Sequence, residues 1–230
     1  PKKRVVINKD VCEGCGDCSV QSNCVSIEPL ETELGRKRKI NQSNCNKDYS
    51  CIKGFCPSFV TVDAEIKNNT GFKDLGELPE PQFKTNQDVN NIMLTGIGGT
   101  GVLTISAILA YAAHYEGKDA SVLDMTGLAQ KGGAVKSFLR IFEKPEDVGA
   151  IRLSYGDTNL LLGFDLLVSN DLEIIKTLDK KISKLIINTD EVMPGDFTRD
   201  KNFYLPFDEM RDNLINIAGQ ENIKFISSNK

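Results

Sequence analysis

Seven cysteines are the residues of this sequence most able to do chemistry. All of them lie between Cys12 and Cys56, and the rest of the 230-residue chain contains none. The first group has the pattern Cys12-x2-Cys15-x2-Cys18, and Cys24 follows it. Three thiolates at this close spacing can reach three irons of one cubane when the loop wraps around it. The pattern therefore indicates an iron–sulfur site.

The second group has the pattern Cys45-x5-Cys51-x4-Cys56 and is followed by Pro57. A final Cys-Pro is typical of the end of a ferredoxin motif, and in two-cluster ferredoxins that last Cys ligates the cluster of the other group. The ligands expected on this rule for a first [4Fe–4S] cluster are Cys12, Cys15, Cys18 and Cys56.

Cys24, Cys45 and Cys51 then remain for a second site, one thiolate short of a full cubane set. That site is a [3Fe–4S] cluster, a [4Fe–4S] cluster with a fourth ligand such as Asp48, or no cluster at all. Zinc and free thiols are the competing interpretations of all seven cysteines. Zinc sites more often use separated Cys-x2-Cys pairs, because tetrahedral coordination brings two such pairs face to face.

A glycine-rich turn is the second chemical feature. Residues 92–95 form an apolar run typical of a buried strand, Gly96-x-Gly98-x-x-Gly101 follows it, and residues 102–115 have the pattern of a helix. This order, with an acid such as Asp124 at the end of the next strand, is the context of a dinucleotide-binding fingerprint. An iron–sulfur flavoprotein or NAD-binding reductase is therefore the alternative function. The motif alone is weak, since small residues there also allow close packing of strand and helix.

The elements beyond this turn predict the fold class. Residues 130–133 (Gln-Lys-Gly-Gly) lead into an apolar strand at 134–142, where a dinucleotide fold would continue into a crossover helix. The apolar runs 159–162 and 184–188 predict further strands, and residues 172–178 predict a helix. Strands that alternate with helices favour a largely parallel sheet covered on both faces.

Composition divides the chain into three parts. Residues 1–63 are cysteine-rich, residues 64–90 are polar and read as a linker, and residues 91–230 carry the alternating strands and helices. A charged segment, residues 33–40, lies between the two cysteine groups. We interpret it as a solvated hairpin that turns at Gly35, because charge runs usually face water. The alternative is a positive patch that raises the potential of a cluster or docks an acidic electron carrier.

Bulk composition excludes several classes of protein. Hydrophobic residues make up 40% of the chain, charged residues 26%, and the net charge is −4, which fits a globular protein and no nucleic-acid partner. No apolar run reaches the roughly 18 residues of a membrane span. An odd number of cysteines without a secretory signal argues for a reducing compartment, and so for a cytoplasmic protein that binds metal.

The glycine turn and the Gln130-Lys131-Gly132-Gly133 loop together resemble the gamma domain of thiamine-dependent 2-oxoacid:ferredoxin oxidoreductases. The order of a cysteine-rich segment and then this domain resembles the long fused indolepyruvate ferredoxin oxidoreductases. The resemblance runs from about residue 5 to residue 207. Its most specific segments are residues 11–18, 40–45, 54–60 and 188–199.

This resemblance implies an α/β chain in which a small ferredoxin-like α+β iron–sulfur domain precedes a Rossmann-like gamma domain. The family decarboxylates an aryl 2-oxoacid on thiamine diphosphate with Mg, transfers the acyl group to coenzyme A, and passes electrons through iron–sulfur clusters to ferredoxin. In fused members the thiamine-binding domains precede the cysteine segment and the gamma domain continues further. We therefore expect an internal piece, inactive alone, from an enzyme that is a homo-oligomer at full length. The resemblance also implies that glycine-turn residues face the thiamine domains or coenzyme A. Those residues are Gly98, Gly99, Gly101 and Gln130.

Overall fold

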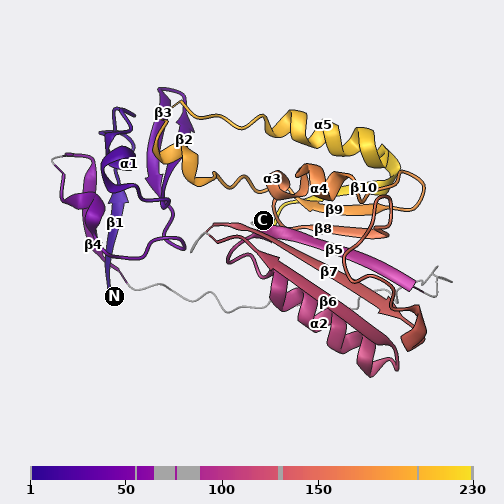
Figure 1. Ribbon diagram of the computed structural model, residues 1–230. Helices are drawn as coiled ribbons and strands as arrows, with labels where there is room; N and C mark the ends of the chain where they lie inside the picture. The colour runs from indigo at the N-terminus through magenta and orange to yellow at the C-terminus, as the bar shows by residue number, and fades with distance from the viewer. Residues whose placement is uncertain are drawn as a thin grey trace. The chain divides into compact units, whose positions relative to one another are not determined.

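The chain folds into two compact units in the computed structural model, which describes residues 2–54, 56–64, 76, 89–128, 132–200 and 202–228. One unit comprises Pro1–Phe83 together with Met193–Leu205, and the other comprises Lys84–Val192 together with Pro206–Lys230 (Figure 1). The segment Met193–Leu205 thus belongs with the cysteine-rich unit, although it is distant in sequence. Most of the expected linker, residues 64–90, lies outside the described residues.

Two strand pairs form the cysteine-rich unit. β1 (Lys3–Ile7) pairs antiparallel with β4 (Phe59–Asp63), and β2 (Ile27–Thr32) pairs antiparallel with β3 (Gly35–Ile40). Helix α1 (Asp17–Ser22) lies between β1 and β2 along the chain. Because β1 and β4 are the first and last strands of the segment, their pairing brings the two cysteine groups to the same end of the unit.

A six-stranded sheet forms the second unit, in the order β10-β9-β8-β5-β7-β6. Its strands are β5 (Val89–Ile97), β6 (Asp119–Thr126), β7 (Ala134–Phe142), β8 (Leu160–Gly163), β9 (Lys184–Asn188) and β10 (Ile223–Ile226). Its helices are α2 (Val102–Tyr115), α3 (Leu166–Ser169), α4 (Leu172–Ile175) and α5 (Phe207–Ala218).

This sheet is mixed, so the prediction of a largely parallel sheet was wrong for two of its ladders. β5, β8, β9 and β10 are parallel, whereas β7 runs antiparallel to both β5 and β6. The physical reason is the length of the connection from β6 to β7, which is residues 127–133. A parallel crossover needs about a dozen residues or more, so a connection this short returns the chain antiparallel.

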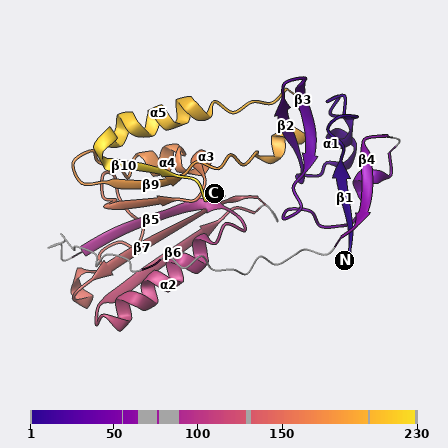
Figure 2. The same cartoon turned by 180° about the vertical axis from the view of Figure 1, so that it is seen from behind.

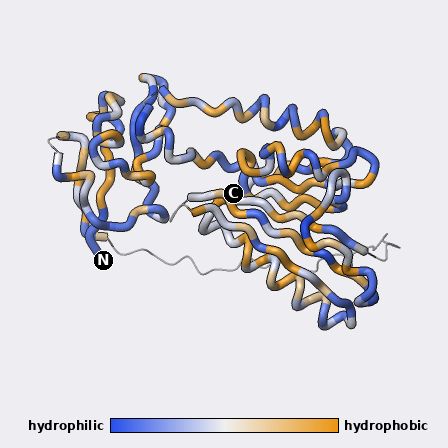
Figure 3. Tube along the Cα trace, in the orientation of Figure 1, coloured by the Kyte–Doolittle hydropathy of each residue, from blue (hydrophilic) through white to orange (hydrophobic). Residues whose placement is uncertain are grey.

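Helices cover both faces of the sheet, as the sequence predicted (Figures 1 and 2). Leu94 of β5 packs with Val102 of α2 and Leu139 of β7 in one apolar cluster. Thr95, the next residue, points to the other face, where its Oγ1 lies 2.9 Å from Ser169 Oγ of α3. Hydrophobic residues run along the strands between these layers (Figure 3).

Candidate iron–sulfur site and glycine-rich loops

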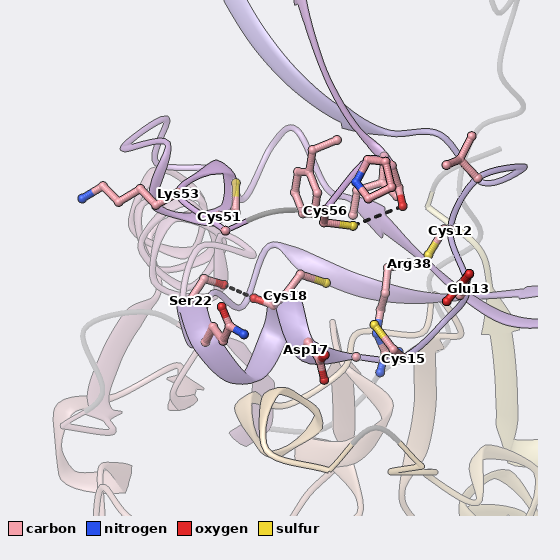
Figure 4. A pocket seen from close by; sticks show the side chains of 18 of the residues that line it. Cys12, Glu13, Cys15, Asp17, Cys18, Ser22, Arg38, Cys51, Lys53 and Cys56 are labelled. Carbon is pink, nitrogen blue, oxygen red and sulfur yellow. Dashed lines mark hydrogen bonds between the residues drawn. The ribbon is translucent and has the colours of Figure 1, made fainter.

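Five cysteines line one cavity in the cysteine-rich unit. The cavity measures about 630 Å³, and its lining includes all four residues expected to hold the first cluster: Cys12, Cys15, Cys18 and Cys56. Their sulfurs surround one part of the cavity, while the sulfur of Cys51 lies at its other end (Figure 4). The cavity therefore holds the four cysteines expected for the first cluster and one cysteine of the second group.

The loop after β1 holds the first three of these cysteines. Its start is fixed by the Cys12 N–H, which donates to the Asn8 carbonyl at 3.0 Å. Gly14 has φ +73°, and a Cβ there would lie 2.1 Å from the Arg36 carbonyl oxygen. Only glycine fits this close backbone approach, which lets the loop turn between Cys12 and Cys15.

β-Strand pairing carries Cys56 to the same cavity. Ile7 and Phe59 are partners in the β1–β4 register, so the residues after β1 lie beside the residues before β4. Cys56 Sγ is 3.2 Å from Ser58 Oγ. A hydroxyl at this distance can donate a hydrogen bond to a thiolate, and such bonds help to set the potential of a cluster.

Cys24, Cys45 and Cys51 form the second group. The pKa of the Cys51 thiol is raised to about 11. Burial is the largest cause, and the nearby Cys24 and Cys45 thiols also contribute. The backbone N–H of Lys47 donates to Cys45 Sγ at 3.4 Å. Cys24 and Cys45 are therefore both neighbours of Cys51.

Asp48, the possible fourth ligand of that group, has another role here. Its Oδ1 accepts hydrogen bonds from the backbone N–H and the Oγ of Ser50, both at 3.0 Å. These bonds hold the pKa of the Asp48 carboxyl below its usual value. The carboxylate thus caps the turn that leads into the 3₁₀ segment Ser50–Ile52.

The seven cysteines are all free thiols. Within the described parts of the chain, no group of three or more His, Cys, Asp or Glu side chains is arranged to hold a metal ion. The ligands of an iron–sulfur cluster stand around a volume, and each binds a different iron.

The charged segment forms the predicted hairpin but faces water only in part. Arg38 is only 2% exposed and lines the cysteine cavity, and Lys37 Nζ donates to the Cys12 carbonyl at 2.6 Å. Burial raises the pKa of the Cys18 thiol, and hydrogen bonds from Ser19 and the charge of Arg38 oppose this rise. The alternation of side chains along a strand could have predicted that Arg38 faces inward, since it places residues 36, 38 and 40 on one face of the hairpin.

The segment Met193–Leu205 packs on the same unit. Arg36 Nη1 donates to the Phe203 carbonyl at 2.6 Å, and Thr198 Oγ1 is 3.0 Å from Asn23 Oδ1. Phe197 is 2% exposed. This segment therefore contacts Asn23, the residue before Cys24. The sequence did not predict this contact.

The glycine turn encloses part of a second cavity, of about 510 Å³. Its lining includes three of the four predicted residues: Gly98, Gly99 and Gly101. The fourth, Gln130, lies outside the described residues. The Gly98 N–H donates to the Gly133 carbonyl at 2.8 Å, so this amide is engaged by the neighbouring loop.

Strand order argues against a dinucleotide at this turn. In the fingerprint, the ribose-binding acid ends a strand near the glycine turn. Here β7 lies between β5 and β6, and neighbouring strands are about 4.8 Å apart. Asp124 of β6 is therefore two strand spacings from β5, or about 10 Å.

Comparison with known proteins identifies the second unit. Residues 91–227 match the family described as "Pyruvate ferredoxin/flavodoxin oxidoreductase". The chain belongs to this family. The match begins within β5, after the cysteine-rich segment, and extends through β10.

Curated relatives of this oxidoreductase family are named as enzyme subunits. The chain is 31% identical over 131 residues to "Indolepyruvate oxidoreductase subunit IorB" of Methanothermobacter thermautotrophicus. The aligned residues are 56% of this chain and 62% of the relative. The chain is 32% identical over 120 residues to the subunit of the same name from Archaeoglobus fulgidus, which covers 52% and 56%. The chain thus spans less than two thirds of the length of these relatives.

Two further proteins are similar over a shorter part. "Pyruvate synthase subunit PorC" of Methanocaldococcus jannaschii is 30% identical over 98 residues, 43% of this chain and 53% of the relative. The solved pyruvate oxidoreductase subunit PORC of Thermotoga maritima aligns with 23% identity and a TM-score of 0.36. The aligned part is 50% of this chain and 57% of the PORC chain. Among the helices described for the oxidoreductase-family chain, none has the length and apolar character needed to cross a bilayer.

Proposed function

We propose that this chain is the electron-transfer and gamma portion of a 2-oxoacid:ferredoxin oxidoreductase of the indolepyruvate type. The observation that carries the proposal is the cavity lined by Cys12, Cys15, Cys18 and Cys56 in the same chain as the oxidoreductase-family sheet. The names of the curated relatives support a 2-oxoacid oxidoreductase.

The cysteine-rich unit is the part that would carry electrons, and we propose that it is ferredoxin-like. Its four cavity cysteines would hold a [4Fe–4S] cluster, which accepts and releases single electrons when bound. The chain's own contribution is to fix these thiolates. Gly14 lets the loop turn, Lys37 holds the Cys12 carbonyl, and Ser58 contacts the Cys56 sulfur.

A second cluster is proposed on Cys24, Cys45 and Cys51. The mutual proximity of these three thiols supports it. Three thiolates suit a [3Fe–4S] cluster, or a [4Fe–4S] cluster that takes its fourth ligand from elsewhere. The hydrogen bonds of Asp48 to Ser50 make this carboxylate a weaker candidate for that ligand.

The carbon chemistry would take place in other parts of the enzyme. We propose that thiamine diphosphate and Mg in thiamine-binding domains decarboxylate an aryl 2-oxoacid, that coenzyme A accepts the acyl group, and that ferredoxin receives the electrons. In this scheme the thiamine domains or coenzyme A contact Gly98, Gly99 and Gly101 of the glycine turn, together with Gln130 of the later loop. Indolepyruvate is the proposed substrate because two of the curated relatives carry that name.

Anaerobic purification of the 230-residue chain tests the electron-transfer role. We expect iron and acid-labile sulfide in equal or nearly equal amounts, and broad absorbance near 400 nm. Zinc without sulfide would contradict the proposal. The matched pair Cys56→Ser and Cys45→Ser tests the ligand sets. By electron paramagnetic resonance (EPR), the first change should perturb only the cluster held by Cys12, Cys15 and Cys18, and the second only the other cluster. If Cys56→Ser perturbs only the EPR signal of the second cluster, the assignment of Cys56 to the first cluster is wrong.

A further inference from the structure

Arg38 is an unusual residue to find buried. It is among the largest side chains that the described residues bury completely, with 2% of its surface exposed. It lies in β3 opposite Pro29 of β2, and it lines the cavity together with the four cysteines. Figure 4 shows its side chain extending along the cavity toward Cys15.

A buried guanidinium needs negative charge nearby. Arginine stays protonated at all ordinary pH values, and moving a charge out of water is costly unless the charge is paired. Glu13 and Asp17 also line the cavity, but both are exposed to water. The four cysteines share the cavity wall with Arg38, and as ligands of the proposed cluster they would be thiolates.

A cation in this position acts differently on the two redox states of a cluster. Four thiolates make the loaded site anionic, and each added electron increases its negative charge. A neighbouring cation therefore stabilises the reduced cluster more than the oxidised one. The effect is larger in a protein interior than at the surface, because the effective dielectric constant is lower there.

We propose that Arg38 raises the reduction potential of the cluster held by Cys12, Cys15, Cys18 and Cys56 by placing a permanent positive charge at the wall of its cavity. This inference rests on the proposed function, since it requires that cluster. It assigns a specific role to one cation of the hairpin, and none to its neighbour Lys39, whose side chain is 52% exposed and lies 3.7 Å from Glu28.

Three variants of the full chain, purified anaerobically, test this role. Arg38→Gln removes the charge, Arg38→Lys keeps it, and Lys39→Gln removes a hairpin charge that does not face the cavity. The measurement is the midpoint potential by EPR-monitored redox titration, with iron and sulfide counted in every sample. We expect Arg38→Gln to disfavour reduction of the first cluster about tenfold, a shift of about 59 mV for one electron. Arg38→Lys should change the equilibrium by less than about threefold and Lys39→Gln by less than about twofold, because each leaves a cation at the cavity wall.

The outcomes separate this inference from the proposed function. A wild-type chain without iron and sulfide would overturn both. A fully loaded Arg38→Gln with the wild-type potential would overturn the role of Arg38 alone. If Arg38→Gln does not retain iron, Arg38→Lys decides. A loaded Arg38→Lys whose reduction equilibrium is displaced more than tenfold would show that charge is not what Arg38 supplies.

Discussion

The two units of this chain are stabilised by different interactions. Among the described residues of the cysteine-rich unit, the buried apolar side chains are those of Val5, Cys12, Ile27, Phe197 and Leu205. The sheet unit buries many more, of which Met93, Leu94, Leu139, Leu161 and Ile187 are completely inaccessible to solvent. A unit with so small an apolar core is marginal alone, and small domains of this kind usually need a metal or disulfides.

The use of charged side chains follows the same division. In the cysteine-rich unit, Arg38 and Lys37 point inward, to the cavity and to the Cys12 carbonyl. In the sheet unit, Lys136 Nζ forms ion pairs near the surface, at 2.6 Å from Asp171 and 3.1 Å from Glu173. The first unit thus directs cationic side chains toward its cysteine-lined cavity, and the second keeps its ion pairs outside an apolar core.

Removal of the proposed clusters should have the largest effect, and only on the cysteine-rich unit. Metal binding to such small units is coupled to folding, because the ligands lose their common partner when the metal leaves. After anaerobic chelation, we expect hydrogen exchange to show loss of amide protection in β1–β4. Protection in β5, β7 and β8 should stay unchanged and serves as the internal control. Retained protection in β1 and β4 would show that the small apolar core is sufficient.

Leu139→Ala should have the next largest effect, and only on the sheet unit. Leu139 is completely buried and packs against Leu94 and Val102. Truncation of such a side chain lowers the free energy of unfolding by about 2–5 kcal/mol. Urea denaturation measures this change, and the iron content should equal that of the wild type. Leu103→Ala, at a position that is 40% exposed, is the matched control and should change stability by only about 0.5 kcal/mol. Loss of iron in Leu139→Ala would show that the units do not fold independently.

Asp171→Asn should have the smallest effect. Burial raises the pKa of the Asp171 carboxyl, but the hydrogen bonds from Lys136 and from the Glu173 N–H, together with the charge of Lys136, outweigh it, so the net pKa lies below the usual value. The folded state therefore favours the carboxylate. The resulting stability is present above about pH 4 and is lost as the pH falls through the lowered pKa. Asn can still cap α4 as Asp171 does through the Glu173 N–H, so the substitution tests the ion pair alone.

Chemical denaturation at two pH values measures this contribution. At pH 7 the wild type should exceed Asp171→Asn by up to about 1 kcal/mol, the usual range for a partly exposed pair. At a pH below the lowered pKa the difference should vanish. A difference that persists there would assign the effect to packing or capping instead of charge.

Sequence patterns predicted the local elements well. The helix at residues 102–115 and the strand at 134–142 coincide with α2 and β7, because each depends on periodicity within a single window of sequence. The α/β fold class and the 2-oxoacid oxidoreductase family are confirmed. The assignment of ligands to two clusters stays a prediction. The four cysteines expected for the first cluster line one cavity, and Cys51 of the second group lines it too.

The sequence by itself determined the identity and spacing of the thiols and the glycines that let the chain turn beside them, since both are local properties of a loop. Only the tertiary structure decided that β7 enters the sheet antiparallel, that Met193–Leu205 packs on the distant cysteine-rich unit, and that Arg38 lines the cavity. These features depend on which remote surfaces pair and on which side chain fills the remaining space. No short window of sequence contains that information, because the partners are tens of residues apart and meet only when the chain is folded.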